Sequence, residues 1–438
     1  MQNFIFAINS NSRAGAEPAF TNITLDITPD RVLADSPAMW KGMPLTFEGK
    51  DICYKDCQEQ IDMINKAFCE IMVEGDAAGK PFSYPIPTYN IHDRFDWDNK
   101  KNDPMWEMAG KYGIPYFANF LNSDMKPEDV RSMCCRLRIS TKEISKKNGG
   151  YFGAGDNTGS IGVGTINLPQ LAYLAEDEVT FFDLLEKALI TLKDSLEIKR
   201  KFIQEKVLDA GLVPAFMQYV GTIRNHFSTI GYIGMNEMCE NFYGVDILDP
   251  KGKEFAEKVC DFINDMILKF QEETGNLYNF EASPAESTCY RLAKKDKEKY
   301  PKIKTAGNTV PYYTNSCHMP VDKVEGIKQL FDHQESLQVK HSGGTVNHIY
   351  LDSSILGEQA KEIVRATCTS YKVPYISLSP LNRSCPEHGY QDTKSLDCPI
   401  CGKPLRLFQR ITGYIREVSN FNAGKGAEFA DRKQISHG

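Results

Sequence analysis

The sequence has no long hydrophobic run and no excess of positive charge. No apolar stretch reaches the roughly 18 residues that cross a bilayer, and residues 1–7 lack the basic start and apolar centre of a secretory signal. Lys and Arg number 51 against 58 Asp and Glu, a formal net charge of −7, so no broad basic face is expected to bind nucleic acid. These absences disfavour a membrane-spanning, secreted or dedicated DNA-binding protein, and they make the cytoplasm the expected location.

The chain also lacks internal repeats of 20–50 residues and low-complexity blocks. Its thirteen cysteines are odd in number and scattered through 438 residues without a secretory signal. This usage favours reduced thiols, metal ligands or redox chemistry over a disulfide framework. Hydrophobic residues make up 41% and charged residues 25%, which is typical of a folded globular protein.

Helical and strand-like segments alternate along the chain. Residues 179–208 and 255–270 repeat apolar side chains every three or four positions, which predicts two amphipathic helices, and Gly211 is expected to end the first. Short strands are predicted at residues 20–26, 160–168, 229–234 and 345–351. The alternation indicates an α/β architecture, and the composition changes near Leu381, where Cys, Gly and Pro replace the helical pattern.

A metal-binding motif lies near the C-terminus. Cys385-Pro-Glu-His388 is followed after nine residues by Cys398-Pro-Ile-Cys401, and two such pairs can place four ligands around one tetrahedral zinc ion. Incidental surface cysteines are the weaker alternative. Because four protein ligands fill the coordination shell, the predicted zinc is structural and stabilises a segment with little core of its own. A nucleic-acid-binding ribbon fits the acidic charge balance poorly.

Directly after this motif comes Thr412-Gly413-Tyr414, which by itself is a turn glycine between two strand-like pieces. In this setting the sequence resembles the radical-bearing loop of glycyl radical enzymes, and its details are similar to the anaerobic, class III ribonucleoside-triphosphate reductases. The stretches that carry the resemblance follow the family's order: 18–24, 85–91, 133–138, 158–162, 234–239, 284–288, 311–316 and 343–346.

The resemblance implies radical reduction of ribonucleoside triphosphates to 2′-deoxyribonucleoside triphosphates, for DNA synthesis. Gly413 would store a backbone radical, since its α-carbon lies between an amide nitrogen and a carbonyl and carries no Cβ. Cys239 would become the thiyl that abstracts hydrogen from the ribose, on an inner loop of a ten-stranded α/β barrel that excludes water and oxygen. A separate radical S-adenosylmethionine activase would install the glycyl radical, and formate or a thiol protein would be the reductant. A homodimer is also implied.

Several polar residues are candidates for substrate contact. Asn90, Tyr313 and Asn315 are expected to line the pocket, and backbone amides at Gly343, Gly344 and Thr345 could cradle a triphosphate; a tight turn into the following strand is an equally good interpretation of that glycine pair. The vicinal pair Cys134-Cys135 is expected to be packing rather than catalytic, because an alternating strand pattern follows it. The glycine-rich residues 153–164 match neither a P-loop nor a dinucleotide fingerprint.

The sequence departs from the family at its start. Residue 1 already lies close to the first matching stretch, so the family's ATP-cone regulatory domain, the first barrel elements and the partner cysteine are not matched. We expect residues 1–380 to form the catalytic barrel portion, 381–404 the zinc ribbon, and 405–438 the glycyl radical loop and tail. The alternatives are a split-gene or non-catalytic subunit that needs a second chain, and a glycyl radical enzyme of the formate-lyase type.

Overall fold

The protein is described by a computed structural model that covers residues 1–10, 18, 20–29, 34–77, 79–122, 130–132, 138–140 and 158–436. The chain forms two compact units. The first comprises Met1–Cys134, Val346–Phe421 and Gln434–Gly438, and the second Cys135–Thr345 and Asn422–Lys433. Each unit is therefore built from segments that are distant in sequence.

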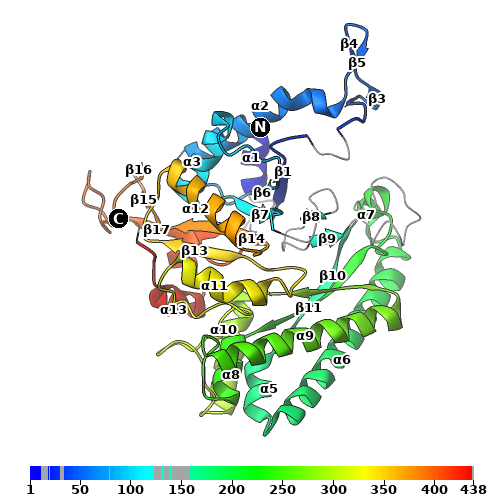
Figure 1. Cartoon of the computed structure of the whole chain (residues 1–438), viewed down its shortest axis with the longest axis vertical. Coiled ribbons are helices and arrows are strands. Elements are labelled where there is room, and N and C mark those ends of the chain that lie inside the picture. Colours follow the sequence, from blue (N-terminus) through cyan, green and yellow to red (C-terminus); the bar gives the residue numbers. More distant parts are fainter. Residues whose placement is uncertain are drawn as a thin grey trace. The chain divides into compact units, whose positions relative to one another are not determined.

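A five-stranded sheet forms the centre of the first unit. Its order is β1-β6-β7-β14-β13, with parallel neighbours except for the antiparallel pair β7 and β14. The inner strands are buried over their whole length, as expected for a sheet covered by helices. Figure 1 shows α3 and α12 together beside this sheet. The strand bounds are β1 Asn22–Leu25, β6 Ile86–Ile91, β7 Tyr116–Asn119, β13 Asn347–Leu351 and β14 Tyr375–Pro380.

A second, antiparallel sheet in this unit has the order β16-β15-β17-β18. Its strands are β15 (Asn382–Cys385), β16 (Gly389–Tyr390), β17 (Arg406–Arg410) and β18 (Ile415–Glu417). The helices of the unit and its small outlying strands are α1 Gln2–Asn9, α2 Gln58–Glu74, α3 Asp103–Tyr112, α12 Gly357–Ser370, β2 Met39–Trp40, β3 Met43–Pro44, β4 Thr46–Phe47, β5 Lys50–Asp51 and β8 Val130–Ser132, with short 3-10 turns at Tyr54–Cys57, Lys100–Asn102 and Val418–Asn420.

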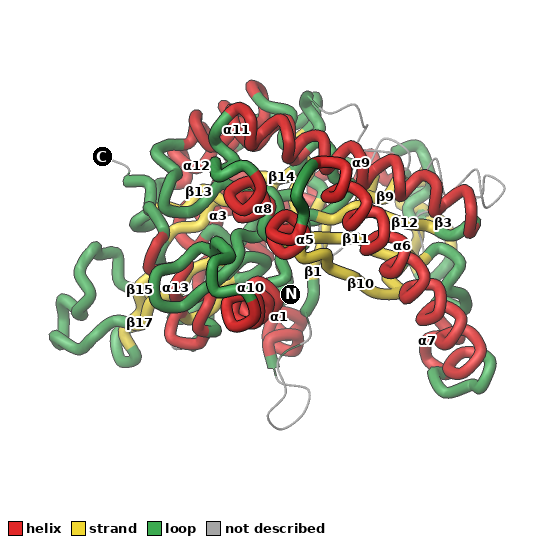
Figure 2. The backbone as a smooth tube through the Cα atoms, turned by 90° about the horizontal axis from the view of Figure 1, so that it is seen from below, coloured by secondary structure: helices red, strands yellow, loops and turns green. Residues whose placement is uncertain are grey.

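The second unit contains a three-stranded parallel sheet, β10 (Gly159–Asn167), β11 (His226–Ile233) and β12 (Leu277–Glu281). The long helices α6 (Glu178–Phe202) and α9 (Pro250–Thr274) lie along it, as Figure 2 shows. Asp177 caps the start of α6 by accepting from the Thr180 amide, and Gly275, in the left-handed region at φ 69°, ends α9. The apolar faces of both helices pack with the strands into one core.

The remaining elements of the second unit are shorter. They are β9 Arg138–Ser140, α5 Leu168–Leu174, a π-helical turn at Ile203–Leu208, α7 Pro214–Tyr219, α8 Met235–Phe242, α10 Glu286–Lys299, α11 Ile327–Gln338 and α13 Ala423–Asp431. Helix α13 packs on α10. A side chain at position 424 would clash, because its Cβ would lie 2.5 Å from Cβ of Tyr290, so the contact between the helices requires Gly424.

The mixed α/β architecture is confirmed, as are both predicted helices and the four predicted strands, with bounds shifted by a few residues. The described strands lie in separate sheets rather than in one closed ten-stranded ring, so the barrel stays a prediction. Cys134-Cys135 and residues 153–157 lie outside the described residues. Within the described part of the chain, no helix is long and apolar enough to cross a membrane.

Candidate active site and metal centre

The four predicted metal ligands come together at the end of β15. One ligand atom from each of Cys385, His388, Cys398 and Cys401 lies within 4.8 Å of all the others. The Sγ atoms of Cys385 and Cys401 are 3.7 Å apart, and Nδ1 of His388 lies 3.5 Å from Cys385 Sγ and 3.7 Å from Cys398 Sγ.

This geometry fits a tetrahedral zinc ion. Zn–S bonds of about 2.3 Å and Zn–N bonds of about 2.0–2.1 Å place tetrahedral ligand atoms about 3.5–3.8 Å apart, which the three separations match. The chemistry of the donor set agrees, since zinc binds the deprotonated thiolate. Burial raises the pKa of the Cys385 thiol, but hydrogen bonds from the backbone amides of Glu387 and His388 lower it by more, so the pKa is lowered overall. These four residues can therefore hold zinc, which would cross-link β15 to the loop before β17.

The metal centre and the predicted radical loop share one sheet. Strand β15 ends at Cys385 and pairs with β17, and β17 pairs with β18 so that Arg410 lies opposite Ile415. The loop between β17 and β18 contains Gly413 and is closed by the Ile411 amide, which donates to the Tyr414 carbonyl at 2.9 Å. A distortion at the metal centre can thus reach Gly413 through two adjacent strand pairs.

A buried arginine holds the Gly413 loop in place. Arg410 is 1% exposed, and its guanidinium donates to the Ile114 carbonyl at 3.1 Å, to the Gly113 carbonyl, and to the Tyr116 hydroxyl at 2.6 Å. The Tyr116 hydroxyl in turn donates to the Gly413 carbonyl at 2.8 Å, and Arg410 lies over the Tyr116 ring. The carbonyl next to the predicted radical carbon is therefore fixed by two side chains of its own unit.

The fold itself does not require a glycine at position 413. Gly413 is not among the residues with positive φ, and a Cβ built on it would meet nothing within 4 Å. Gly234 shows the opposite case, because its φ is 71° and a Cβ there would lie 2.3 Å from Pro169. Backbone conformation and space thus explain Gly234 but leave Gly413 without a packing reason.

Cys239 lies on helix α8 and not on the loop that the resemblance implied. The α8 segment begins at left-handed Gly234, and the apolar positions of its first turns turn inward. Cys239 is fully buried in the apolar core, and its thiol donates to the Gly252 carbonyl at 3.3 Å. Burial raises the pKa of this thiol, which keeps the S–H bond that hydrogen-atom transfer requires. Gly413 and Cys239 belong to different units, and their pairing stays a prediction.

A buried carboxyl group lies two residues before Cys239. Glu237 is 0% exposed and accepts from the Thr314 amide at 2.9 Å, the Thr314 hydroxyl at 2.6 Å and the Asn236 amide nitrogen at 3.2 Å. Burial raises the pKa of Glu237 to about 7, although the Thr314 donors oppose the shift. Glu237 thus ties α8 to the segment that follows α10.

That segment runs past the carboxyl end of β11, where open parallel sheets commonly bind ligands. Asn315 forms a bridge with Ile233, and Gly234 donates to the Thr314 carbonyl. Tyr313 is fully buried, and its hydroxyl donates to Asp296 at 2.9 Å. The structure therefore brings Tyr313 and Asn315 to one strand end.

Residues 343–345 approach the neighbouring strand. Gly344 has a φ of 74°, and a Cβ there would lie 2.3 Å from the Ala282 carbonyl oxygen, so its glycine has a packing reason. The amides of Ser342 and Gly343 both donate to the Phe280 carbonyl. A phosphate-cradling role would therefore rest on Gly344 and Thr345 rather than on Gly343.

Three buried hydroxyls in this region have no hydrogen-bond partner among the described residues: Ser283 Oγ, Ser316 Oγ and Thr345 Oγ1. Buried polar groups are almost always paired, so these hydroxyls are candidates for contact with a polar group of a ligand. Ser283 was not singled out in the sequence, although it follows β12 directly and precedes the family stretch 284–288.

Asn90 belongs to the other unit, and its place in the substrate pocket stays a prediction. It lies on β6 in the first unit, where its side-chain nitrogen donates to Asp26 at 3.5 Å. Arg410 and Tyr116, which hold Gly413, were also not identified as site residues. Their contact joins positions 294 residues apart, and nothing in the local sequence signals it.

The comparisons with known proteins agree with this geometry. The family described as "Anaerobic ribonucleoside-triphosphate reductase" matches residues 1–435. The chain belongs to this family. Membership was predicted from the eight ordered stretches and Thr412-Gly413-Tyr414, and it is confirmed.

Individual relatives are distant. The anaerobic ribonucleoside-triphosphate reductase of Haemophilus influenzae is 24% identical over 309 residues, which are 64% of this chain and 43% of that protein. The enzyme of the same name from Enterobacteria phage T4 is 24% identical over 333 residues, 69% of this chain and 52% of that protein. A solved anaerobic ribonucleotide reductase is 21% identical and superposes with a TM-score of 0.79, covering all of this chain and 68% of that one. The chain thus spans about half the length of these curated relatives.

Proposed function

We propose that this chain catalyses the anaerobic reduction of ribonucleoside triphosphates to 2′-deoxyribonucleoside triphosphates. Family membership over residues 1–435 supports the reaction class. The observation that carries the residue assignment is Gly413, a buried glycine that neither φ nor space explains. A requirement for a carbon flanked by two peptide groups and lacking Cβ explains it.

In the proposed reaction, Gly413 Cα first loses a hydrogen atom to the activase. The Gly413 radical then takes the hydrogen atom of the Cys239 thiol, which restores glycine and leaves a thiyl. The thiyl abstracts the C3′ hydrogen of the ribose, and the 2′-hydroxyl takes up a proton and leaves as water. Formate, which is oxidised to CO2, or a thiol protein, which is oxidised to a disulfide, supplies the two reducing electrons. The hydrogen atom held by Cys239 then returns to C3′, which regenerates the thiyl. Thr345 and Ser283 would bind polar groups of the nucleotide, and Tyr313 and Asn315 would line its pocket.

Other parts of the proposal rest on the resemblance. They are a ten-stranded barrel completed around the described sheets, a boundary between barrel and ribbon near residue 380 with the ribbon at 381–404 and the radical loop and tail at 405–438, a structural zinc, a homodimer, a radical S-adenosylmethionine activase as partner, and a cytoplasmic location. Because the chain covers 43% and 52% of the two relatives, activity is to be assayed both without and with a second chain that supplies the remaining family region.

The test is electron paramagnetic resonance after anaerobic activation. Wild-type protein should give a doublet from coupling to the single remaining α-hydrogen, and CTP should be converted to dCTP. Gly413→Ala should give no glycyl doublet. Since Ala fits the space and the backbone, the variant should be about 0.4–1 kcal/mol more stable toward unfolding, so loss of signal cannot be attributed to misfolding. A doublet that persists in Gly413→Ala removes the assignment, and conversion of pyruvate instead of CTP favours the formate-lyase type.

A further inference from the structure

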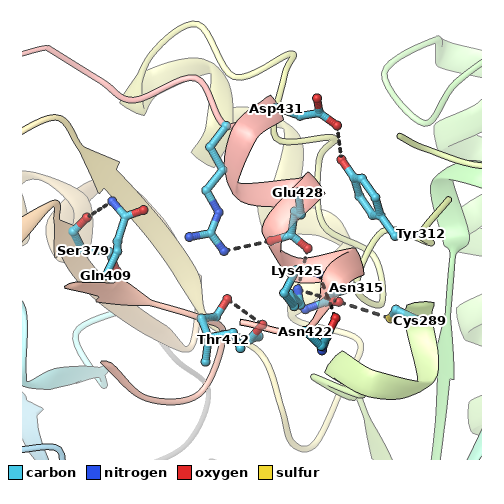
Figure 3. Close-up of polar contacts among 12 residues, drawn as sticks. Cys289, Tyr312, Asn315, Ser379, Gln409, Thr412, Asn422, Lys425, Glu428 and Asp431 are labelled. Atoms are coloured by element: carbon cyan, nitrogen blue, oxygen red, sulfur yellow. Dashed lines mark hydrogen bonds and ion pairs between the residues drawn. The ribbon is translucent and has the colours of Figure 1, made fainter. Parts of the chain in front are cut away.

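Helix α13 places three charged side chains in the interior of the second unit. Lys425, Glu428 and Arg432 have side-chain exposures of 1%, 7% and 0%. Glu428 lies between the two cations, 2.5 Å from Lys425 Nζ and 2.8 Å from Arg432. Figure 3 shows Lys425 and Glu428 together on one face of the helix. Burying two cations and a carboxylate away from solvent is costly unless their hydrogen-bond donors also find further acceptors.

Asn315 provides such an acceptor for Lys425. Lys425 Nζ donates to the side-chain oxygen of Asn315 at 3.2 Å, and the Cys289 thiol donates to the same oxygen at 3.2 Å (Figure 3). An amide whose oxygen accepts from a cation and a thiol cannot flip without facing two donors with its own N–H groups. Lys425 therefore sets the orientation of the Asn315 amide.

The whole segment around Asn315 is held in the same way from two helices. On one side, α13 carries Asp431, which accepts from the Tyr312 hydroxyl at 2.9 Å (Figure 3). On the other side, α8 carries Glu237, which accepts twice from Thr314. Three anchors, two on α13 and one on α8, thus fix residues 312–315, and none of them is local in sequence.

We propose that Lys425 is a positioning residue for the substrate: by orienting the Asn315 amide it couples recognition of the ribonucleoside triphosphate to the seating of α13. The inference rests on the proposed function, in which Asn315 lines the nucleotide pocket. Coupling is reciprocal by linkage, so a bound nucleotide stabilises seated α13, and seated α13 strengthens nucleotide binding.

Helix α13 follows shortly after Gly413 in the chain, so the proposed coupling also affects the segment that carries Gly413. Gly413 lies ten residues before Ala423, and the chain between them, up to Phe421, belongs to the first unit, whereas Asn422–Lys433 belongs to the second. A nucleotide that secures α13 therefore secures the C-terminal end of the segment that carries Gly413. Binding of the nucleotide would thus stabilise the position of the segment that carries Gly413 without any contact between the nucleotide and Gly413.

The experiment compares two buried cations of the same cluster. Lys425→Met removes the charge bonded to both Glu428 and Asn315, whereas Arg432→Met removes the charge bonded to Glu428 on the next turn. Each variant leaves Glu428 with one cationic partner, so their losses of thermal stability should be similar. Equilibrium binding of CTP to unactivated full-length protein is then measured, which requires neither radical nor turnover.

Lys425→Met should raise the dissociation constant of CTP about tenfold, as expected for a lost charge-assisted hydrogen bond that orients a contact group, and Arg432→Met should change it less than about twofold. Equal weakening in both variants, or no change in Lys425→Met, overturns the inference and leaves the proposed function standing. Failure of wild-type protein to bind CTP overturns the proposed function itself.

A second measurement uses the unaltered protein, and it decides the matter if Lys425→Met does not fold. Hydrogen exchange of the amides in Ala423–Asp431 is followed with and without CTP. Slower exchange with CTP supports the coupling, and pyruvate serves as the small-anion control that should have no effect. Unchanged exchange of α13 under saturating CTP overturns it.

Discussion

At the scale of single residues, the candidates for a functional role are the residues whose identity packing does not explain. Gly413 has room for a Cβ and an ordinary φ, while Ser283 and Thr345 leave buried hydroxyls without a partner among the described residues. Gly344, by contrast, is explained by its close approach to Ala282. The distinction separates a residue that packing explains from the residues for which we propose a role in the reaction.

Cys239→Ser is expected to separate storage of the radical from its use. Ser keeps the size and the hydrogen bond to the Gly252 carbonyl, but its O–H bond is too strong for a glycyl radical to break. The variant should show the wild-type doublet and form no dCTP above background. Because Cys239 lies in an apolar core, Cys239→Ala serves as the control for the cost of a buried hydroxyl.

Retained turnover in Cys239→Ser would show that another thiol carries the reaction. Cys134 and Cys135 are then the first to replace, one at a time, under the same assay. Cys134 and Cys135 lie within the family stretch 133–138 and were expected to be packing residues, so turnover that is lost on replacing either one would correct that expectation.

Glu237 gives the molecule a pH dependence whose sign is fixed. Its pKa in the folded protein is about 7 because burial raises it above the ordinary 4.5, so between these values the folded state binds more protons than the unfolded state. Stability from this group is therefore present below about pH 4.5 and is lost as the pH rises toward 7. Glu237→Gln, which cannot ionise, should lack this loss, and the melting temperature of wild type relative to the variant should fall between pH 5 and pH 7.5. A constant difference across that range would contradict the assignment.

At the scale of elements, the sheet β16-β15-β17-β18 joins the metal centre to the radical loop. Cys385 ends β15, β15 pairs with β17, and β17 leads into the loop of Gly413. The loop is additionally tied to β7 through Tyr116. A metal that stabilises β15 therefore also stabilises the register of the strand that precedes Gly413.

Cys398→Ser should remove the zinc and loosen this sheet. We expect the zinc content to fall from about one per chain to near zero, hydrogen exchange in β15 and β17 to rise, and the yield of glycyl radical to drop at least about tenfold, since structural zinc contributes folding free energy directly. Cys53→Ser is the matched control, because Cys53 is a half-buried thiol of the same unit outside the cluster. A wild-type radical yield in zinc-free Cys398→Ser protein would contradict the coupling.

Sequence patterns predicted the elements better than their assembly. The helix periodicity in residues 179–208 and the spacing of the four metal ligands depend on neighbours within one segment, so both could be read directly. Arg410 with Tyr116, and Lys425 with Asn315, join positions 294 and 110 residues apart, and no local pattern encodes such pairs. Cys239 was expected on an inner loop because the resemblance implied it, whereas the structure places it in helix α8, where residues 235–239 are all buried.

At the scale of the whole molecule, the chain passes between its two units more than once. Residues 346–421 belong to the first unit, 422–433 to the second, and 434–438 to the first again. The short return segment is helix α13 with its buried charges. The covalent connection between residues 346–421 of the first unit and α13 therefore begins in the region that carries Gly413.

Exposure of activated protein to air should break that continuity. Dioxygen adds to a glycyl radical at Cα, and cleavage of the backbone there should release a C-terminal peptide of about 25 residues, as the 438-residue length and position 413 require. Unactivated protein and Gly413→Ala should stay intact, and Cys239→Ser should be cut like wild type. Mass spectrometry of the fragments checks the position, and a cut elsewhere would contradict storage at Gly413.

The return of α13 to the second unit determines what such a nicked protein becomes. The severed peptide still contains Lys425, Glu428 and Arg432, whose side chains are buried in the intact protein. We therefore expect the nick to be invisible in native gel filtration and to appear only in denaturing gels, with the two pieces persisting as a non-covalent heterodimer. A synthetic peptide equivalent to residues 414–438 should exchange into that assembly only slowly. The severed peptide would then behave as a tightly bound subunit and not as a tail that dissociates after cleavage.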